Sequence, residues 1–264
     1  MLALTDAEIR LLLSTYLWPL FRVMGFLLAD PLFGTKAVPR RVKVVLAIAL
    51  TLLLVPLLPP MPAVPVVSGE GVFIIVQQLL IGVAMGFAMR LVITAVELAG
   101  AMIGMQMGLG FAMQFDPMMG AQVPSLSRLL TLSTYLVLLS FNGHLIMLGT
   151  VAESFTLFPI SLDPLPAAGL QLVAAWGGKM LALALWLSLP VVVALLITNL
   201  AIGVMTRAAP QFNIFSFGFP LTLLIGFVVL YYALPFMGQA LQQLYLQGFE
   251  LMRQTLMVKG GGGA

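Results

Sequence analysis

Long apolar runs separated by short polar loops occupy most of this chain. Six such runs occur, at residues 11–29, 44–58, 72–96, 129–152, 172–205 and 217–246. About 20 helical residues cross the roughly 30 Å hydrocarbon core of a bilayer. Runs of this length and character are typical of helices in a membrane protein. The pattern therefore predicts an all-α integral membrane protein, with residues 1–264 forming a single membrane domain.

Prolines inside the apolar runs indicate that these helices are not six straight rods. Pro19, Pro190, Pro220 and Pro235 all fall within runs. Proline removes a backbone donor and kinks or ends a helix, and broken helices are tolerated in membranes where protein surrounds the backbone. We therefore expect bent or broken helical hairpins, and we expect Pro190 to kink the fifth run or divide it in two.

The composition narrows the possible functions. Hydrophobic residues make up 61% of the chain and charged residues only 8%, against roughly 25% charged in soluble domains. The chain has no cysteine and one histidine, which disfavours thiol chemistry and metal sites. It also has no hydrolase, metalloprotease or P-loop motif. We expect no enzyme activity and no cofactor. The expected partner is a lipid bilayer, and no basic aromatic patch points to nucleic acid.

The few charges predict an orientation. The densest positive cluster lies between the first and second runs, which by the positive-inside rule is cytoplasmic. Arg22 is deep in the first run, where lipid exposure costs at least roughly 2.5 kcal/mol, so we expect it to face protein or water. Arg90 and Glu97 lie seven residues apart, too far for a simple intrahelical pair. The predicted topology or interface charges are Arg22, Lys36, Arg40, Arg41, Lys43, Arg90, Glu97, Arg128 and Arg207.

One stretch, residues 100–124, has an unusual composition: GAMIGMQMGLGFAMQFDPMMGAQVP. Clustered glycines disfavour a long rigid helix, and methionine packs adaptably into irregular space. Two interpretations are equally supported for Gly100, Gly104 and Gly108, namely close helix packing and pore lining. Asp116-Pro117 is expected to form a turn or cap. His144 is interpreted as a structural, hydrogen-bonded histidine in preference to a proton relay.

Four separated blocks of the sequence carry a resemblance to a known family. They are FRVMGFLLADPLFGTKAVPRRVK at 21–43, QMGLGFAMQFDPMMGAQVPSLSR at 106–128, FNGH at 141–144 and TNLAIGVMTRAAPQFNIFSFGFPLT at 198–222. In this order they resemble the FliR family of flagellar biosynthesis proteins, which has relatives in virulence type III secretion. The resemblance implies a subunit of the flagellar export gate. That gate is a helical pore built with the FliP and FliQ proteins in the bacterial inner membrane, at the flagellar basal body.

The resemblance also implies partners and parts. Unfolded flagellar subunits would pass through the pore, and the FlhB switch protein would bind nearby. Residues 1–170 would resemble FliP, and residues 171–250 would form a FliQ-like hairpin. From its glycine-rich composition, the segment 251–264 is expected to be a flexible tail. A loop matching residues 106–120 would plug the closed pore. Its members are Gln106, Met107, Gly108, Leu109, Gly110, Phe111, Ala112, Met113, Gln114, Phe115, Asp116, Pro117, Met118, Met119 and Gly120.

Within this plug the residue types suggest two roles. Apolar side chains exclude hydrated ions, and glycines allow a loop to move. We expect Gly108 and Gly110 to supply freedom of movement. The side chains expected to form the seal are Met107, Phe111, Met113, Phe115, Met118 and Met119.

Three alternatives remain open at this point. The chain is a virulence-type export subunit, a proton-coupled transporter using His144, Arg90 and Glu97, or a purely structural scaffold. A passive gate is favoured because so few charges cannot form a proton relay chain.

Overall fold

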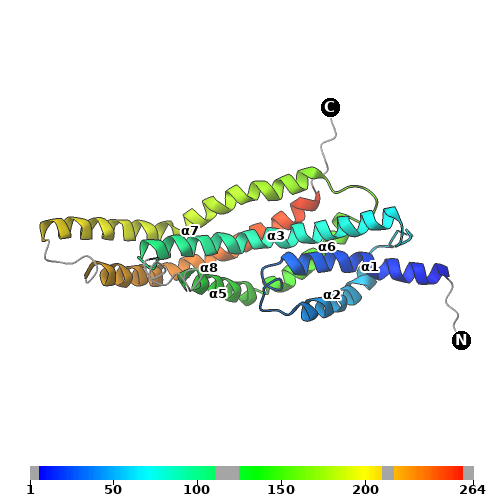
Figure 1. Cartoon of the computed structure of the whole chain (residues 1–264), viewed down its shortest axis with the longest axis horizontal. Coiled ribbons are helices and arrows are strands. Elements are labelled where there is room, and N and C mark those ends of the chain that lie inside the picture. Colours follow the sequence, from blue (N-terminus) through cyan, green and yellow to red (C-terminus); the bar gives the residue numbers. More distant parts are fainter. Residues whose placement is uncertain (1–5, 63, 111–124, 210–216, 258–264) are drawn as a thin grey trace, which may run out of the picture. The chain divides into compact units, whose positions relative to one another are not determined.

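The computed structural model describes residues 6–62, 64–110, 125–209 and 217–257, with side chains from residue 13 onward. Every regular element in these ranges is a helix (Figure 1). The elements are α1 (Asp6–Ala29), α2 (Arg40–Leu54), the 3₁₀ turn η1 (Val55–Leu57), α3 (Gly69–Gln106), α5 (Ser125–Ser140), α6 (Gly143–Leu157), α7 (Ala167–Ala208) and α8 (Phe219–Met257). The all-α prediction is confirmed.

The apolar runs become helices of very different length. α3, α7 and α8 are 38, 42 and 39 residues long and apolar enough to cross a membrane. The fourth run divides into α5 and α6, which together form a further candidate span bent by 70°. α2 has only 15 residues. By length and composition, the described part of the chain thus holds three candidate spans, or four with the bent pair.

The breaks do not all occur at prolines. α7 passes through Pro190, and α8 through Pro235, as continuous helices, so of the two outcomes expected at Pro190, a kink or a division, the division is not observed. The 70° bend lies instead at the FNGH block, where Asn142 takes a left-handed φ of 57° before α6 begins. Asparagine tolerates this conformation better than most residues.

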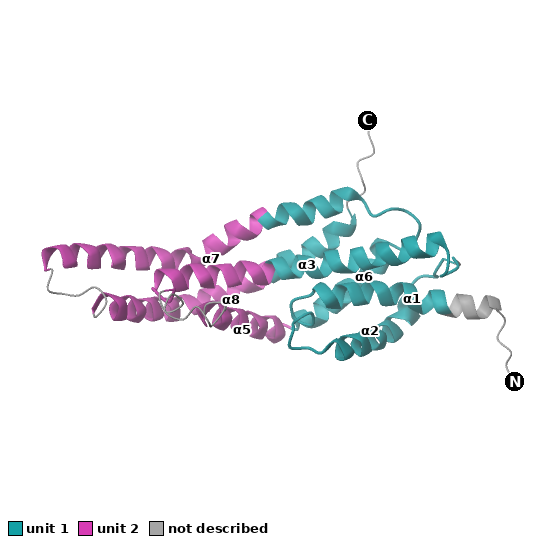
Figure 2. Cartoon of the chain, in the orientation of Figure 1, with its two compact units in different colours: residues 1–91, 142–177, 245–264 teal, residues 92–141, 178–244 magenta. Residues whose placement is uncertain are grey.

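The chain divides into two compact units (Figure 2). Unit 1 contains residues 1–91, 142–177 and 245–264, and unit 2 contains residues 92–141 and 178–244. α3, α7 and α8 each contribute residues to both units. The division near residue 170 into FliP-like and FliQ-like parts is a different one and stays a prediction.

Unit 1 is built on a close crossing of α1 and α3. A Cβ at Gly82 would lie 2.1 Å from the carbonyl oxygen of Arg22, and one at Gly86 would lie 2.7 Å from that of Phe26. From the other side, a Cβ at Gly25 would lie 2.6 Å from the carbonyl oxygen of Leu79. Glycines in the Gly-xxx-Gly pattern let two helix backbones approach this closely.

Candidate functional site: the start of the glycine and methionine segment

α3 ends at the glycine and methionine segment through a defined backbone motif. Gly108 has φ 80°, the left-handed conformation that favours glycine. Its N–H donates to Met105 O (3.0 Å), and the N–H of Leu109 donates to Gly104 O (3.0 Å). This pair of bonds is the Schellman motif, which satisfies the last carbonyls of a helix. Gly108 therefore stops α3 at a fixed residue.

The helix end is held by a buried methionine. Met107 is fully buried, and a Cβ at Gly226 of α8 would lie 2.7 Å from its Cγ and 3.0 Å from its Sδ. Met107 thus occupies the space that a side chain at position 226 would need. Asn199 Nδ2 of α7 donates to the carbonyl oxygen of Gln106 at 3.5 Å, which is the long limit of a hydrogen bond. These contacts at Met107 and Gln106 form the anchor of the segment. The anchor is mainly apolar, and its polar contact is weak.

The glycines before Gln106 take part in helix packing. A Cβ at Gly100 would lie 2.6 Å from the Cα of Ser127 in α5, and Ser127 Oγ donates to Glu97 O (2.9 Å). One turn further on, Gly104 is buried. Helix packing is confirmed for Gly100.

The structure describes five members of the predicted plug. Met107 is buried, Gln106, Gly108 and Leu109 are half-buried, and Gly110 is exposed. The remaining ten, Phe111, Ala112, Met113, Gln114, Phe115, Asp116, Pro117, Met118, Met119 and Gly120, lie outside the described residues. The sealing role of the segment stays a prediction.

Most of the predicted topology charges lie on the surface of the chain. Lys43 is half-buried and donates to Gly34 O (2.8 Å), and Glu97 is half-buried. The exposed members are Lys36, Arg40, Arg41, Arg90, Arg128 and Arg207.

Arg22 is the exception, because it is fully buried in unit 1. Its Nε donates to Gln78 Oε1 (2.7 Å) on α3. Its Nη1 donates to Ser154 O (2.8 Å) and its Nη2 to Phe158 O (2.9 Å). The guanidinium also lies 4.2 Å from the ring centroid of Phe155, a cation–π distance. All these partners belong to the same chain and are neutral, so no second subunit is needed to explain this buried charge.

The position of the Arg22 guanidinium suits its charge. Ser154 lies in the last turn of α6, and Phe158 is its C-cap. Carbonyl groups at a helix C-terminus carry partial negative charge, which a cation stabilises. Arg22 therefore joins α1 to α3 and to the end of α6 with one planar side chain that has several donors.

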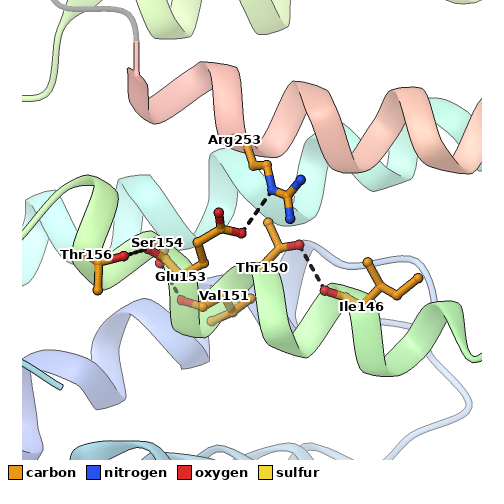
Figure 3. A network of polar contacts seen from close by, with 7 residues as sticks. All are labelled: Ile146, Thr150, Val151, Glu153, Ser154, Thr156 and Arg253. Atoms are coloured by element: carbon orange, nitrogen blue, oxygen red, sulfur yellow. Dashed lines mark hydrogen bonds and ion pairs between the residues drawn. The ribbon is translucent and has the colours of Figure 1, made fainter. Parts of the chain in front are cut away.

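The neighbour of Ser154 on α6 makes a second link within unit 1. Glu153 points toward Arg253 near the end of α8 (Figure 3), and Arg253 Nε lies 2.9 Å from Glu153 Oε2. Both side chains are more than a third exposed, and exposed ion pairs contribute little, typically under about 1 kcal/mol. The buried link through Arg22 is the more consequential one.

Asp30, directly after α1, is a buried acid that the sequence reasoning did not single out. Its Oδ2 accepts from the backbone N–H groups of Leu32 and Phe33, both at 2.8 Å. Its Oδ1 is buried without a hydrogen-bond partner. Burial raises the pKa of Asp30 to about 7, and the two backbone hydrogen bonds oppose that rise. Asp-Pro at the end of an apolar run signals a turn, but the sequence gives no sign of its burial.

The crossing glycines of α3 also carry a signal in the sequence. Gly82 and Gly86 form a Gly-xxx-Gly pattern inside the third run, the same pattern that the sequence shows from Gly100 to Gly108.

His144 was expected to be a hydrogen-bonded structural residue. Its Nδ1 atom is buried without a hydrogen-bond partner, so the expected hydrogen bond is not made at that atom.

Comparisons with known proteins identify the relatives of this chain. The model of the bacterial export proteins, family 1, matches residues 13–248. The chain is 38% identical to the flagellar biosynthetic protein FliR of Pectobacterium carotovorum subsp. carotovorum, over 92% of this chain and 93% of that protein. It is 37% identical to FliR of Escherichia coli (strain K12), over 97% and 98%, and 28% identical to FliR of Bacillus subtilis (strain 168), over 94% and 97%.

The chain therefore belongs to the bacterial export proteins, family 1, and within them to the FliR family of flagellar biosynthesis. It is a membrane component of the flagellar protein export apparatus. The resemblance drawn from the four sequence blocks is confirmed.

Proposed function

We propose that this chain is a subunit of the flagellar export gate in the bacterial inner membrane. With FliP and FliQ it forms the pore that passes unfolded flagellar subunits, and residues 106–120 plug that pore when it is closed. FlhB is the expected switch partner. The proposal rests on family membership and on the chemistry of the segment that follows α3.

The observation that supports the plug most directly is the anchored start of this segment. The Schellman motif at Gly108 and the buried Met107 fix where the helix ends. Residues 111–120 contain a single charge, Asp116, and three methionines and two phenylalanines. A loop with a fixed origin and apolar, adaptable side chains suits a seal against hydrated ions.

The weakness of the polar contacts at this anchor suits a gate. Asn199 reaches Gln106 only at 3.5 Å. Five residues before Met107, the Met102 sulfur lies 3.6 Å from Ser188 Oγ, whose shorter hydrogen bond goes to Leu185 O at 3.0 Å. Sulfur is a weak acceptor. Methionine packing against glycine is re-formed easily in another arrangement, so opening does not require a strong polar contact to break.

The first experiment removes the plug and keeps its anchor. Deleting residues 111–119 leaves the Schellman motif and Met107 in place. Co-expressed with FliP and FliQ and reconstituted in vesicles, the deleted gate is expected to show a raised resting ion conductance. A conductance equal to that of the intact gate rejects the plug.

A matched pair of methionines tests the anchor itself. Met107 is fully buried and Met105, two residues earlier, is 62% exposed. Met107→Ala is expected to raise resting conductance, because the buried contact with Gly226 is lost. Met105→Ala removes the same atoms from an exposed position and is the control. Equal conductance in the two variants would show that the buried Met107 contact does not keep the gate closed.

The transporter alternative predicts a different result. If His144 relays protons, His144→Ala abolishes export while the complex assembles normally. A passive gate retains export in this variant. Export by His144→Ala, compared with assembly of FliP and FliQ in the same cells, distinguishes the two functions.

A further inference from the structure

α2 is an apolar helix that the rest of unit 1 leaves largely uncovered. Of its 15 residues only Ala47 and Thr51 are buried, and the helix packs beside α1 (Figure 1). Its apolar side chains Val45, Leu52 and Leu53 are 66%, 56% and 69% exposed. At about 1.5 Å per residue α2 is roughly 22 Å long, too short to cross a bilayer of about 30 Å. Its uncovered face therefore needs an explanation other than a membrane span.

The first turn of α2 carries positive charge where a helix favours negative charge. Arg40, Arg41 and Lys43 all lie there, no acidic residue does, and Pro39 provides no side-chain cap. A helix N-terminus disfavours nearby cations by a few tenths of a kcal/mol or more each. Lys36 adds a fourth cation from the preceding loop. In the described part of the chain none of the four forms an ion pair.

Arg41 and three apolar positions share one face of the helix. Arg41, Val45, Ile48 and Leu52 follow a spacing of four, three and four residues, which aligns side chains along one side of an α-helix. Ala47 and Thr51, the two buried residues of α2, lie to one side of this line of residues, and α2 packs against α1. From Arg41 to Leu52 the helix rises about 16 Å, close to half of the hydrocarbon thickness of a bilayer. One end of this face fits an anionic headgroup, and the rest fits one acyl chain.

We propose that this face of α2 binds an anionic phospholipid. Lys36, Arg40 and Arg41 contact the headgroup phosphate, and Val45, Ile48 and Leu52 contact the acyl chain. The charge complementarity favours this occupant, because Arg41 heads an apolar strip of one leaflet's depth and the exposed Lys36 and Arg40 lie at the same end of α2. No residue of this surface belongs to the plug, so the lipid site and the gate can fail independently.

The first test uses the purified full chain in neutral detergent. It is incubated with phosphatidylglycerol or phosphatidylcholine of the same acyl chains, and retained lipid is counted by native mass spectrometry. Phosphatidylglycerol is expected to be retained preferentially, and the preference should fall with added salt. The triple variant Lys36→Gln, Arg40→Gln, Arg41→Gln should lose about fivefold in affinity per cation, on the order of 100-fold in all.

Two control variants test whether the loss of lipid in the triple variant is specific to these cations and to their charge. Arg128→Gln with Arg207→Gln removes two exposed cations elsewhere and should leave retention unchanged. Arg40→Lys with Arg41→Lys keeps the charge and should keep the lipid. Equal retention of both lipids by the wild-type chain, or undiminished retention by the triple variant, rejects the site.

A second measurement tests the acyl-chain half in a chain that keeps its cations. Because the chain has no cysteine, Ile48→Cys can carry a single spin label in vesicles of 70% phosphatidylcholine and 30% phosphatidylglycerol. The label should be relaxed by oxygen, which dissolves in lipid, and protected from a water-soluble reagent. Relaxation by the water-soluble reagent, or protection from both because a protein partner covers the face, overturns the proposal.

Discussion

The two portions of α3 are held in contrasting ways. In unit 1 the helix crosses α1 at Gly82 and Gly86 with backbones almost touching, and Gln78 receives a 2.7 Å hydrogen bond from buried Arg22. In unit 2 the same helix ends against a methionine–glycine contact and a 3.5 Å amide contact. Both portions are similarly apolar in sequence.

This difference separates a fixed attachment from a releasable one. At a glycine crossing the two backbones pack directly against each other, so relative movement of the helices breaks close contacts. A buried guanidinium with several acceptors leaves unsatisfied groups if it moves. Methionine contacts re-form in several arrangements. We infer that any movement linked to the plug begins at the end of α3 and not at its crossing with α1.

The largest effect is expected from Gly82→Ala. Its Cβ would overlap the Arg22 carbonyl oxygen at 2.1 Å and lie 2.7 Å from the Phe26 nitrogen, so α1 and α3 must separate. We expect a loss of about 3 kcal/mol or more in the free energy of unfolding. Gly238→Ala is the control, because a Cβ there meets nothing within 4 Å, and it should stabilise by about 0.5–1 kcal/mol. Thermal unfolding of the purified chain measures both, and equal stability would show that the crossing is not rigid.

Next in size is the replacement of Arg22. Arg22→Lys keeps a buried charge but loses the planar fork that reaches Gln78, Ser154 and Phe158 together, and we expect a loss of about 3 kcal/mol. Arg22→Met removes the charge and its desolvation cost but leaves acceptors unpaired, for a loss of about 2 kcal/mol. The expected order is therefore arginine, then methionine, then lysine, measured by thermal unfolding. Wild-type stability for the lysine variant would show that charge alone matters.

A third, smaller effect is a dependence of stability on pH through Asp30. Burial raises the folded-state pKa to about 7 from an ordinary value of 3.8, so the folded chain binds more protons than the unfolded chain between these values. Stability is therefore greatest at low pH and falls by about 2 kcal/mol between pH 5 and 7. Asp30→Asn keeps an acceptor for the Leu32 and Phe33 N–H groups but does not ionise, and should remove this slope. Unfolding curves at pH 5, 6 and 7 that keep their slope in the variant would contradict the assignment.

The sequence predicted the helical class well because long apolar runs have few other solutions in a membrane. It predicted less well which of those helices are buried by the rest of the chain. The third run and the fifth are similarly apolar, yet the most apolar window of α3 is 67% buried and that of α7 only 28%. Hydropathy measures transfer out of water and does not distinguish protein from lipid as the new surroundings.

The candidate site was also partly predictable from the sequence. The glycines around residues 100–110 signalled a close approach or a helix end, and the structure shows both, at Gly100 and at Gly108. The burial of Arg22 could be expected from the cost of charge in lipid, but its partners lie 56 to 136 residues away. No local pattern specifies such distant partners. Pro190 illustrates the limit of a local signal in another way, because α7 continues through it as one helix and the sequence alone left both a kink and a division open.

The smallest expected effect lies at the releasable end of α3 and compares two glycines. Gly108 has φ 80°, so Gly108→Ala forces alanine into a left-handed conformation at a cost of about 1 kcal/mol. Gly110 is exposed, and a Cβ there meets nothing within 4 Å, so Gly110→Ala should change stability by less than about 0.5 kcal/mol. Because Gly108 sets the residue at which α3 stops, its variant should also alter resting conductance of the assembled gate, and the Gly110 variant should do so less. Equal conductance in the two variants would mean that the position of the helix end does not control the plug.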